Sequence, residues 1–226
     1  MLCLGRTGSS HLVALLDSHP EIRCYGEVLN ATHRGAAPEG WIGDSEAADA
    51  EAQVERLLEA PGAAARGFKL PLNSLRDRPE IGNWLQLNPG VRVLRLRRRN
   101  RLALLVSRRM LRATLVSQSI YGSYGDRTVR IEPRECVRAL ERIEAEDREL
   151  DNLTAGHQSL QIEYDRLSDE AELVRVQRFL GVMPVPLSSP YKRLRKRSLA
   201  ATVENWEEVS AALEGTRFEP LLIRDG

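Results

Sequence analysis

The chain has 226 residues, of which 42% are hydrophobic and 29% are charged, and its formal net charge is +1. This length suits one sizeable core and is short for two independent domains. A net charge so close to zero excludes a protein that is basic over its whole surface, as many nucleic-acid binders are. No apolar run approaches the roughly 20 residues of a membrane-spanning helix, and there is no signal-peptide pattern, so we expect a cytoplasmic protein without a membrane span.

The charge is nevertheless concentrated locally. Nine arginines and no acidic residue lie between Arg92 and Arg112, and five of the six residues from Lys192 to Arg197 are basic. Such a concentration favours an anionic partner at one place on the molecule. The three cysteines are an odd number without a CxxC spacing, so we expect buried thiols rather than a disulfide framework or a zinc site.

Short apolar runs alternate with amphipathic stretches along the chain, which is typical of an α/β protein with a parallel sheet. In the first hundred residues we expect a strand at 2–4, a helix at 10–17, a strand at 22–25, a helix at 47–59, and strands at 67–70 and 91–96. In the rest of the chain we expect helices at 102–115 and 133–150, a strand at 160–163, a helix from a Ser168 cap to residue 180, and a helix at 201–213. The weakly patterned stretches 30–46 and 116–130 are candidate loops over a site.

The segment from Gly5 to Ser10 connects the first strand to the first helix. Its small residues allow backbone N–H groups to surround an anion, and the helix N-terminus adds partial positive charge. The side chains add a guanidinium and three hydroxyls, and the members of this loop are Gly5, Arg6, Thr7, Gly8, Ser9 and Ser10. The pattern indicates a phosphate-binding loop without the Walker lysine, and the alternative is a turn that only caps the helix.

Arg99 and Ser107 form a second candidate. Arg99 follows the 91–96 strand at its C-terminal end, where ligands bind in open α/β sheets, and Ser107 lies about two turns into the next helix. A guanidinium and a hydroxyl placed in this way can hold one phosphate. The alternative is a solvated basic helix face.

With these motifs the chain resembles the sulfotransferases that use 3′-phosphoadenosine-5′-phosphosulfate (PAPS). The Gly5–Ser10 loop is similar to the family's 5′-phosphosulfate loop, and Arg99 with Ser107 is similar to its 3′-phosphate motif. Further similar segments follow in family order, at 15–24 with 26–27, 162–167, 179–181, 197–198 and 203–206. The cytosolic steroid and phenol branch usually has a lysine where this chain has Arg6, and it has a catalytic histidine without a counterpart here. The resemblance is therefore to the carbohydrate, bacterial and tyrosylprotein branches.

The resemblance implies one sulfotransferase domain over residues 1–226. Its fold would be a three-layer α/β sandwich with a central parallel sheet, of the P-loop-like sulfotransferase type. Segment 186–226 would close over the nucleotide. It implies PAPS as the donor and adenosine 3′,5′-bisphosphate as the product. The donor contacts that it implies are Arg6, Thr7, Gly8, Ser9, Ser10, Arg99, Ser107, Tyr164, Arg197 and Ser198. For Tyr164, Arg197 and Ser198 a purely structural role is the alternative.

Glu27 and Lys69 complete the expected catalytic set with Arg6. Glu27 follows a strand next to Gly26, where the backbone can turn tightly, and we assign it as the general base for the acceptor hydroxyl. Lys69 lies in an apolar run, where a lysine is rarely found without an anionic neighbour, and we expect it to hold the phosphosulfate with Arg6. A solvated loop glutamate and a strand-edge lysine are the alternatives. No metal is expected, because a sulfuryl group carries less charge than a phosphoryl group.

Two other function classes remain alternatives. A P-loop-type kinase or NTPase requires the Walker lysine and a carboxylate for magnesium, and neither is visible. A non-catalytic polyanion-binding module would use the arginine-rich segment, which lacks the interleaved aromatic residues of nucleic-acid binders. The sequence does not identify the acceptor, for which a carbohydrate, a lipid-linked hydroxyl and a tyrosine or other phenol stay open, and it does not define the oligomeric state.

Overall fold

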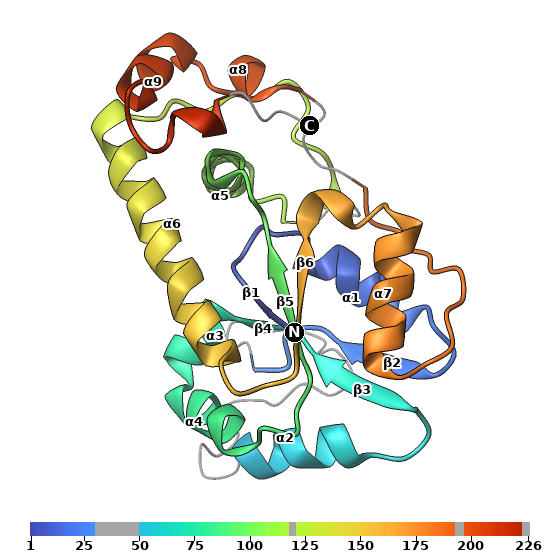
Figure 1. Ribbon diagram of the computed structural model, residues 1–226. Helices are drawn as coiled ribbons and strands as arrows, with labels where there is room; N and C mark the ends of the chain where they lie inside the picture. Colours follow the sequence, from blue (N-terminus) through green and yellow to red (C-terminus); the bar gives the residue numbers. More distant parts are fainter. Residues whose placement is uncertain (30–49, 118–120, 193–196, 223–226) are drawn as a thin grey trace. The chain divides into compact units, whose positions relative to one another are not determined.

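The computed structural model describes residues 1–29, 50–117, 121–192 and 197–222 (Figure 1). The expected loop at 30–46 and the start of the expected 47–59 helix lie outside the described residues. The chain divides into two compact units, Met1–Arg97 with Glu149–Pro190 and Arg98–Arg148 with Tyr191–Gly226. The single sulfotransferase domain and the closing role of segment 186–226 stay predictions.

The first unit is built on parallel strands. Four of them form a sheet in the order β4-β1-β5-β6, and all neighbours in it run parallel. The bounds are Leu70–Pro71 for β4, Leu2–Cys3 for β1, Val93–Arg97 for β5 and Ser159–Glu163 for β6. A second parallel pair consists of β2 (Ile22–Tyr25) and β3 (Ala65–Phe68). The structure therefore confirms the α/β class with a central parallel sheet.

One extended segment connects the two sets of strands. The sequence predicts a single strand at 67–70, whereas the structure has β3 and β4 separated only by Lys69. The Lys69 N–H donates to the carbonyls of Tyr25 (3.2 Å) and Gly26 (3.1 Å), and the Leu70 N–H donates to the Met1 carbonyl at 2.8 Å. The segment thus pairs first with β2 and then with β1, and Lys69 lies at the change of partner.

Helices cover both faces of the sheet in this unit. Helices α1 (Ser9–Asp17) and α7 (Glu170–Leu180) lie together on one face (Figure 1). There they share a core with alternate residues of the strands, among them Leu12, Leu16, Leu94, Leu96, Ile162 and Val176. The intervening β5 residue Arg95 points to the other face, where its Nε donates to Asp151 of α6 (Pro133–Thr154) at 3.1 Å. The arrangement agrees with the expected layering of helices on either side of a sheet.

The sequence analysis missed two helices between β4 and β5. Helix α3 (Leu72–Asp77) is only 6 residues long, and α4 (Pro79–Leu87) follows it after one residue. Helices this short depend on tertiary packing rather than on local propensity. Their buried residues are Leu72, Ser74, Leu75, Ile81, Trp84 and Leu85. The preceding helix α2 (Ala50–Glu59) was expected.

The second unit is mainly helical in its described part. It contains α5 (Arg101–Thr114), most of α6, α8 (Leu199–Thr202) and α9 (Trp206–Leu213). The helix expected at 201–213 is therefore wrong as a single element. Val203 has extended backbone and forms a bridge with Val129, which interrupts the helix between Thr202 and Trp206. The Ser168 cap is also wrong, because the side chain of Asp169 accepts from the Ala171 N–H and caps α7.

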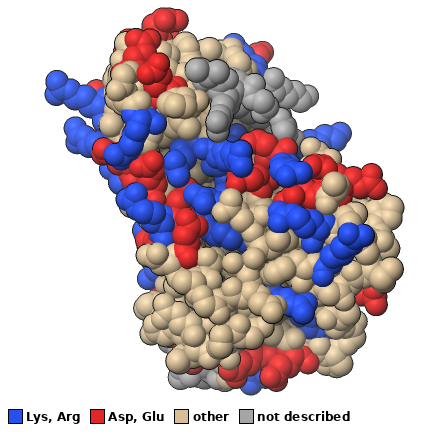
Figure 2. All heavy atoms as spheres, in the orientation of Figure 1, with Lys and Arg blue, Asp and Glu red and all other residues tan. Residues whose placement is uncertain are grey.

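The arginines of α5 have acidic partners on α6. Arg101 contacts Glu144 and Asp147, Arg108 contacts Glu146, and Arg109 contacts Glu135, all at 2.9–3.3 Å. Figure 2 shows acidic and basic side chains next to one another in the upper part of the view, while the lower part is mostly uncharged. The positive charge that the sequence concentrates between Arg92 and Arg112 is thus partly neutralised within the fold.

The cysteines are free and buried, as the sequence predicts. Burial raises the pKa of the Cys24 thiol to about 12 and that of Cys136 to about 11. Because the thiolate is the reactive form, thiols with these pKa values are poor nucleophiles near neutral pH. Within the described ranges, no helix is both long and apolar enough to cross a membrane.

Two neighbouring acidic residues of α6 allow a direct test of how burial affects an ion pair. Asp151 pairs with Arg95, whose side chain is 3% exposed, whereas Glu149 pairs with the exposed Arg76. We expect Asp151→Ala to lower the free energy of unfolding by about 3 kcal/mol, because the guanidinium stays buried without its carboxylate. The matched change Glu149→Ala should cost less than about 1 kcal/mol. Urea unfolding followed by circular dichroism measures both, and equal losses would contradict the expectation.

Candidate functional site

Four of the sequence-predicted positions lie at one edge of the parallel strands. The Gly5–Ser10 loop follows β1, Glu27 follows β2, Lys69 follows β3, and Tyr164 follows β6. Parallel strands place their C-terminal ends at the same edge, which is where ligands bind in open α/β sheets. All four positions belong to the first unit.

Lys69, Glu27 and Ser10 form a compact polar cluster at this edge. The Lys69 Nζ lies 2.6 Å from Glu27 Oε1, and it donates to Ser10 Oγ at 3.3 Å. The lysine side chain is only 9% exposed, while the glutamate side chain is 24% exposed. A buried ammonium requires an anionic partner, and Glu27 supplies it. The structure therefore brings together the loop, the expected base and the expected lysine.

The loop backbone contains two left-handed residues. Gly8 has a φ of 83°, which glycine adopts without strain, and Arg6 has a φ of 73°, which is unfavourable for a residue with a Cβ. Gly8 is also the N-cap of α1, and among the described residues no side chain caps this helix and no acid lies in its first turn. The positive end of the helix dipole therefore has no acid in its own first turn, and this end of a helix favours an anion in front of it.

The loop hydroxyls differ in their surroundings. The Thr7 hydroxyl donates to the Leu4 carbonyl at 2.8 Å and is buried. Ser9 is also buried, and burial raises the pKa of the nearby Cys3 thiol, while the Lys69 charge lowers it. The Thr7 hydroxyl thus holds the loop on the core. Thr7 and Ser9 would thus contact an anion through their backbone N–H groups, while the Ser10 hydroxyl lies at the ammonium.

Tyr164 packs against the loop. A Cβ placed on Gly8 would lie 2.6 Å from Tyr164 Cδ2, 2.8 Å from its Cε2 and 3.1 Å from Leu167 Cδ1. The aromatic ring therefore occupies the space in which any other residue at position 8 would place its side chain. Tyr164 begins a short 3-10 helix, Tyr164–Arg166, directly after β6.

The remaining predicted donor contacts belong to the second unit. Arg99 is exposed just before α5, Ser107 is partly buried in the second turn of that helix, and Asn100 between them caps α5 by accepting from the Ala103 N–H. Arg197 donates to the Asp126 carbonyl at 3.1 Å, and the Ser198 side chain caps α8 by accepting from the Ala201 N–H. Ser198 thus has a structural role as a helix cap, and its contact with a nucleotide stays a prediction. The prediction that these residues bind the same ligand as the Lys69 cluster is not tested by the structure.

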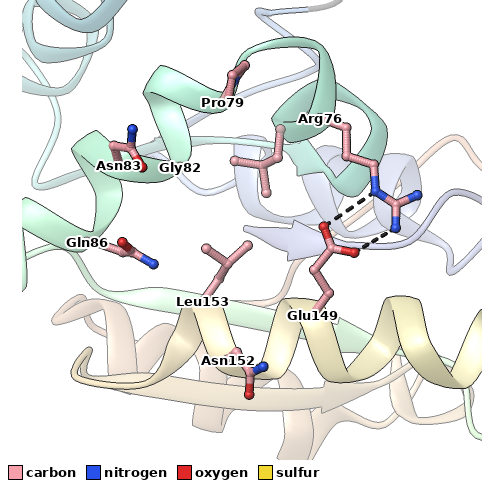
Figure 3. A pocket seen from close by; sticks show the side chains of 9 residues that line it. Arg76, Pro79, Gly82, Asn83, Gln86, Glu149, Asn152 and Leu153 are labelled. Atoms are coloured by element: carbon pink, nitrogen blue, oxygen red, sulfur yellow. Dashed lines mark hydrogen bonds and ion pairs between the residues drawn. The ribbon is translucent and has the colours of Figure 1, made fainter.

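A separate pocket of about 310 Å³ lies between α3, α4 and the end of α6 (Figure 3). The Arg76–Glu149 ion pair lies at one side of it. None of the sequence-predicted residues lines it, and its lining residues are Leu75, Arg76, Pro79, Gly82, Asn83, Gln86, Glu149, Asn152 and Leu153. The strand-edge cluster, where the functional groups converge, is therefore the candidate site rather than this pocket.

Two features next to the loop escaped the sequence analysis. His11 directly follows Ser10, and its Nδ1 lies 2.8 Å from Ser189 Oγ, while burial lowers the pKa of its ring. Its position in the first turn after the loop was the available signal. The packing of Tyr164 on Gly8 had no local signal, because the two residues are far apart in sequence. His157 lies in the loop before β6, with Nδ1 3.1 Å from the Val91 carbonyl.

Comparisons with known proteins do not assign a family. No protein-family model matches the chain, and no curated protein sequence matches it significantly. Within the described residues, no group of three or more His, Cys, Asp or Glu side chains is placed to hold a metal ion.

Because Arg6 has a left-handed conformation, two substitutions at this position can distinguish its effect on stability from its effect on anion binding. Arg6→Gly removes the Cβ strain and Arg6→Ala retains it, while both remove the guanidinium. We expect the glycine variant to be more stable than the alanine variant by about 1 kcal/mol in urea unfolding. Both variants should lose affinity for pyrophosphate to a similar extent in calorimetry. A glycine variant that is the less stable of the two would show that Arg6 is not strained.

Proposed function

We propose that this chain is a PAPS-dependent sulfotransferase, which transfers a sulfuryl group to an acceptor hydroxyl with Glu27 as the general base. The observation that supports it most is the cluster in which Lys69 Nζ lies 2.6 Å from Glu27 and 3.3 Å from Ser10 of the loop. The sequence assigned these residues separately to the base, the lysine for the leaving group and the donor loop. Their side chains meet at the edge of the sheet where ligands bind.

The residues at this edge suit the anionic end of such a donor. The loop offers backbone N–H groups at the N-terminus of α1, with Arg6 and Lys69 as cations. PAPS supplies the sulfuryl group, and its bond from sulfur to the bridging oxygen of the 5′-phosphate breaks as the acceptor oxygen bonds to sulfur. Lys69 and Arg6 stabilise the charge that grows on the departing phosphate oxygen.

Glu27 accepts the proton of the acceptor hydroxyl, and its carboxylate becomes a carboxylic acid during the transfer. The products are a sulfate ester and adenosine 3′,5′-bisphosphate. Lys69 contacts both the base and the loop, so the same ammonium is able to orient the Glu27 carboxylate and to bind the donor. This reaction needs positioning and electrostatic stabilisation, both of which fixed side chains provide.

A polyanion-binding module is less well supported. Its binding face would be the arginine-rich helix α5, yet Arg101, Arg108 and Arg109 already contact acidic residues of α6. Ion pairs with neighbouring carboxylates reduce the charge available for phosphates of a nucleic acid. No comparable observation favours the kinase alternative.

A binding experiment tests the donor site without knowledge of the acceptor. We expect adenosine 3′,5′-bisphosphate to raise the melting temperature once its concentration exceeds Kd, with a smaller effect for adenosine 5′-phosphate. In EDTA, PAPS should be converted to adenosine 3′,5′-bisphosphate when a panel of phenols, sugars and lipid-linked alcohols is added. Absence of binding, or turnover of ATP that requires magnesium, would reject the proposal.

Glu27→Gln tests the base. We expect turnover of PAPS to fall by about 10²–10⁴-fold, the usual contribution of general base catalysis, while the Kd for adenosine 3′,5′-bisphosphate changes less than about threefold. Glu21→Gln is the matched control, because Glu21 is exposed just before β2, and it should leave turnover unchanged. The melting temperature of both variants shows whether a loss reflects unfolding. Normal turnover in a folded Glu27→Gln variant would remove the assignment.

Arg99 and Ser107 test the 3′-phosphate contact. We expect Arg99→Ala to weaken adenosine 3′,5′-bisphosphate by about 10–100-fold, as for a lost charge-assisted hydrogen bond, and Ser107→Ala by less. Binding of adenosine 5′-phosphosulfate, which lacks the 3′-phosphate, should hardly change in either variant. Arg112→Ala, on the same helix, is the control. Equal weakening of both nucleotides would show that the pair does not recognise the 3′-phosphate.

A further inference from the structure

We propose that Tyr164 is a positioning residue whose ring holds the Gly5–Ser10 loop in its anion-binding conformation by packing against Gly8. The role differs from the nucleotide contact that the sequence suggested for Tyr164. It rests on the proposed function only in that the loop binds the anionic end of the donor. It requires no contact between the ring and the nucleotide.

The contact between the ring and the glycine is close. Two ring carbons of Tyr164 would lie within 2.8 Å of a Cβ at position 8, a separation that real side chains do not tolerate. Leu167, which is 3% exposed, approaches the same point at 3.1 Å. The absence of a side chain at position 8 therefore lets the ring lie directly on the loop backbone.

The ring has a firm support on its other side. Tyr164 packs against a hydrophobic core cluster of the first unit, which includes Leu167 and Ile162 of β6. The Leu167 N–H donates to the Tyr164 carbonyl at 3.2 Å, which closes the short helix that carries the ring. Glu163, the residue before it, is paired in register with Arg97 of β5. The ring is thus anchored to β6 and to this core cluster as well as lying against the loop.

The loop is held on the core at Thr7, but two of its other residues need further support. Gly8 has no side chain of its own to restrict its backbone, and Arg6 holds a strained left-handed conformation that persists only where the surroundings enforce it. The backbone N–H groups bind an anion only while they converge. A ring lying on the Cα of Gly8 restricts the loop at the residue where α1 begins. Loss of the ring should therefore weaken any anion that the loop binds, with or without an adenine.

The test compares a nucleotide with an adenine-free probe. We expect Tyr164→Ala to raise the Kd of both pyrophosphate and adenosine 3′,5′-bisphosphate by about tenfold in calorimetry. This factor corresponds to the conformational entropy of roughly one backbone residue, which binding would then have to restrict. Tyr164→Phe keeps the ring and should stay within about twofold of the wild type for both probes. If Tyr164→Ala weakens the nucleotide alone, or if Tyr164→Phe loses as much as Tyr164→Ala, the proposal is wrong.

Phe179→Ala is the matched control for stability. Phe179 is another partly buried ring that packs against the same core cluster, but it lies on α7. Its removal should lower the melting temperature while leaving pyrophosphate affinity unchanged. If Phe179→Ala weakens pyrophosphate as much as Tyr164→Ala does, general loosening of the core explains the effect and the positioning role is rejected.

A double variant tests the contact itself. Gly8→Ala introduces the Cβ that clashes with the ring, and Tyr164→Ala removes the ring. The combined loss of pyrophosphate affinity should be smaller than the product of the two single losses, because residues in contact are not additive. Multiplicative losses would overturn the proposal. A wild type that binds pyrophosphate but not adenosine 3′,5′-bisphosphate would reject the sulfotransferase proposal alone and leave this one standing.

Discussion

The buried ammonium of Lys69 is the constraint around which the edge of the sheet is arranged. Phe68, Lys69 and Leu70 are all buried, because their segment pairs with β2 and then with β1 and is covered on both faces. A lysine there cannot extend to water, and an unpaired charge at such a position costs several kcal/mol. Glu27 provides the compensating charge at 2.6 Å, so the turn after β2 has to bring a carboxylate back over the end of β3.

The same constraint explains which parts of the structure the sequence could predict. The strand at 22–25 was predicted with its observed bounds, and α1 and β5 to within two residues, since their apolar patterns are local. The break at Lys69 depends on a change of partner strand, and the break at Val203 depends on a bridge to Val129. Both are set by residues distant in sequence, which no local pattern reveals.

The site was predictable to a similar degree. The positions of the loop, Glu27 and Lys69 follow from one rule, that parallel strands end at the same edge. The inward turn of the Thr7 hydroxyl, toward the Leu4 carbonyl, depends on the depth of that residue in the core. The arginine-rich segment is a second case in which the sequence alone was not sufficient. Its lack of neighbouring acids in sequence suggested an external anion, yet α6 supplies acidic partners from 26 to 46 residues further along the chain.

Helix α6 has a consequence for how the chain unfolds. It runs for 22 residues, and the boundary between the two compact units, at Arg148 and Glu149, falls within it and not in a loop. Its carboxylates Glu144 and Asp147 bind Arg101 in one unit, while Asp151 binds Arg95 in the other. Melting of either unit would therefore fray a helix that the other unit uses, since helical hydrogen bonds are lost cooperatively. The two units are coupled through continuous backbone, so the chain offers no point at this boundary where it could be cut into separately folding halves.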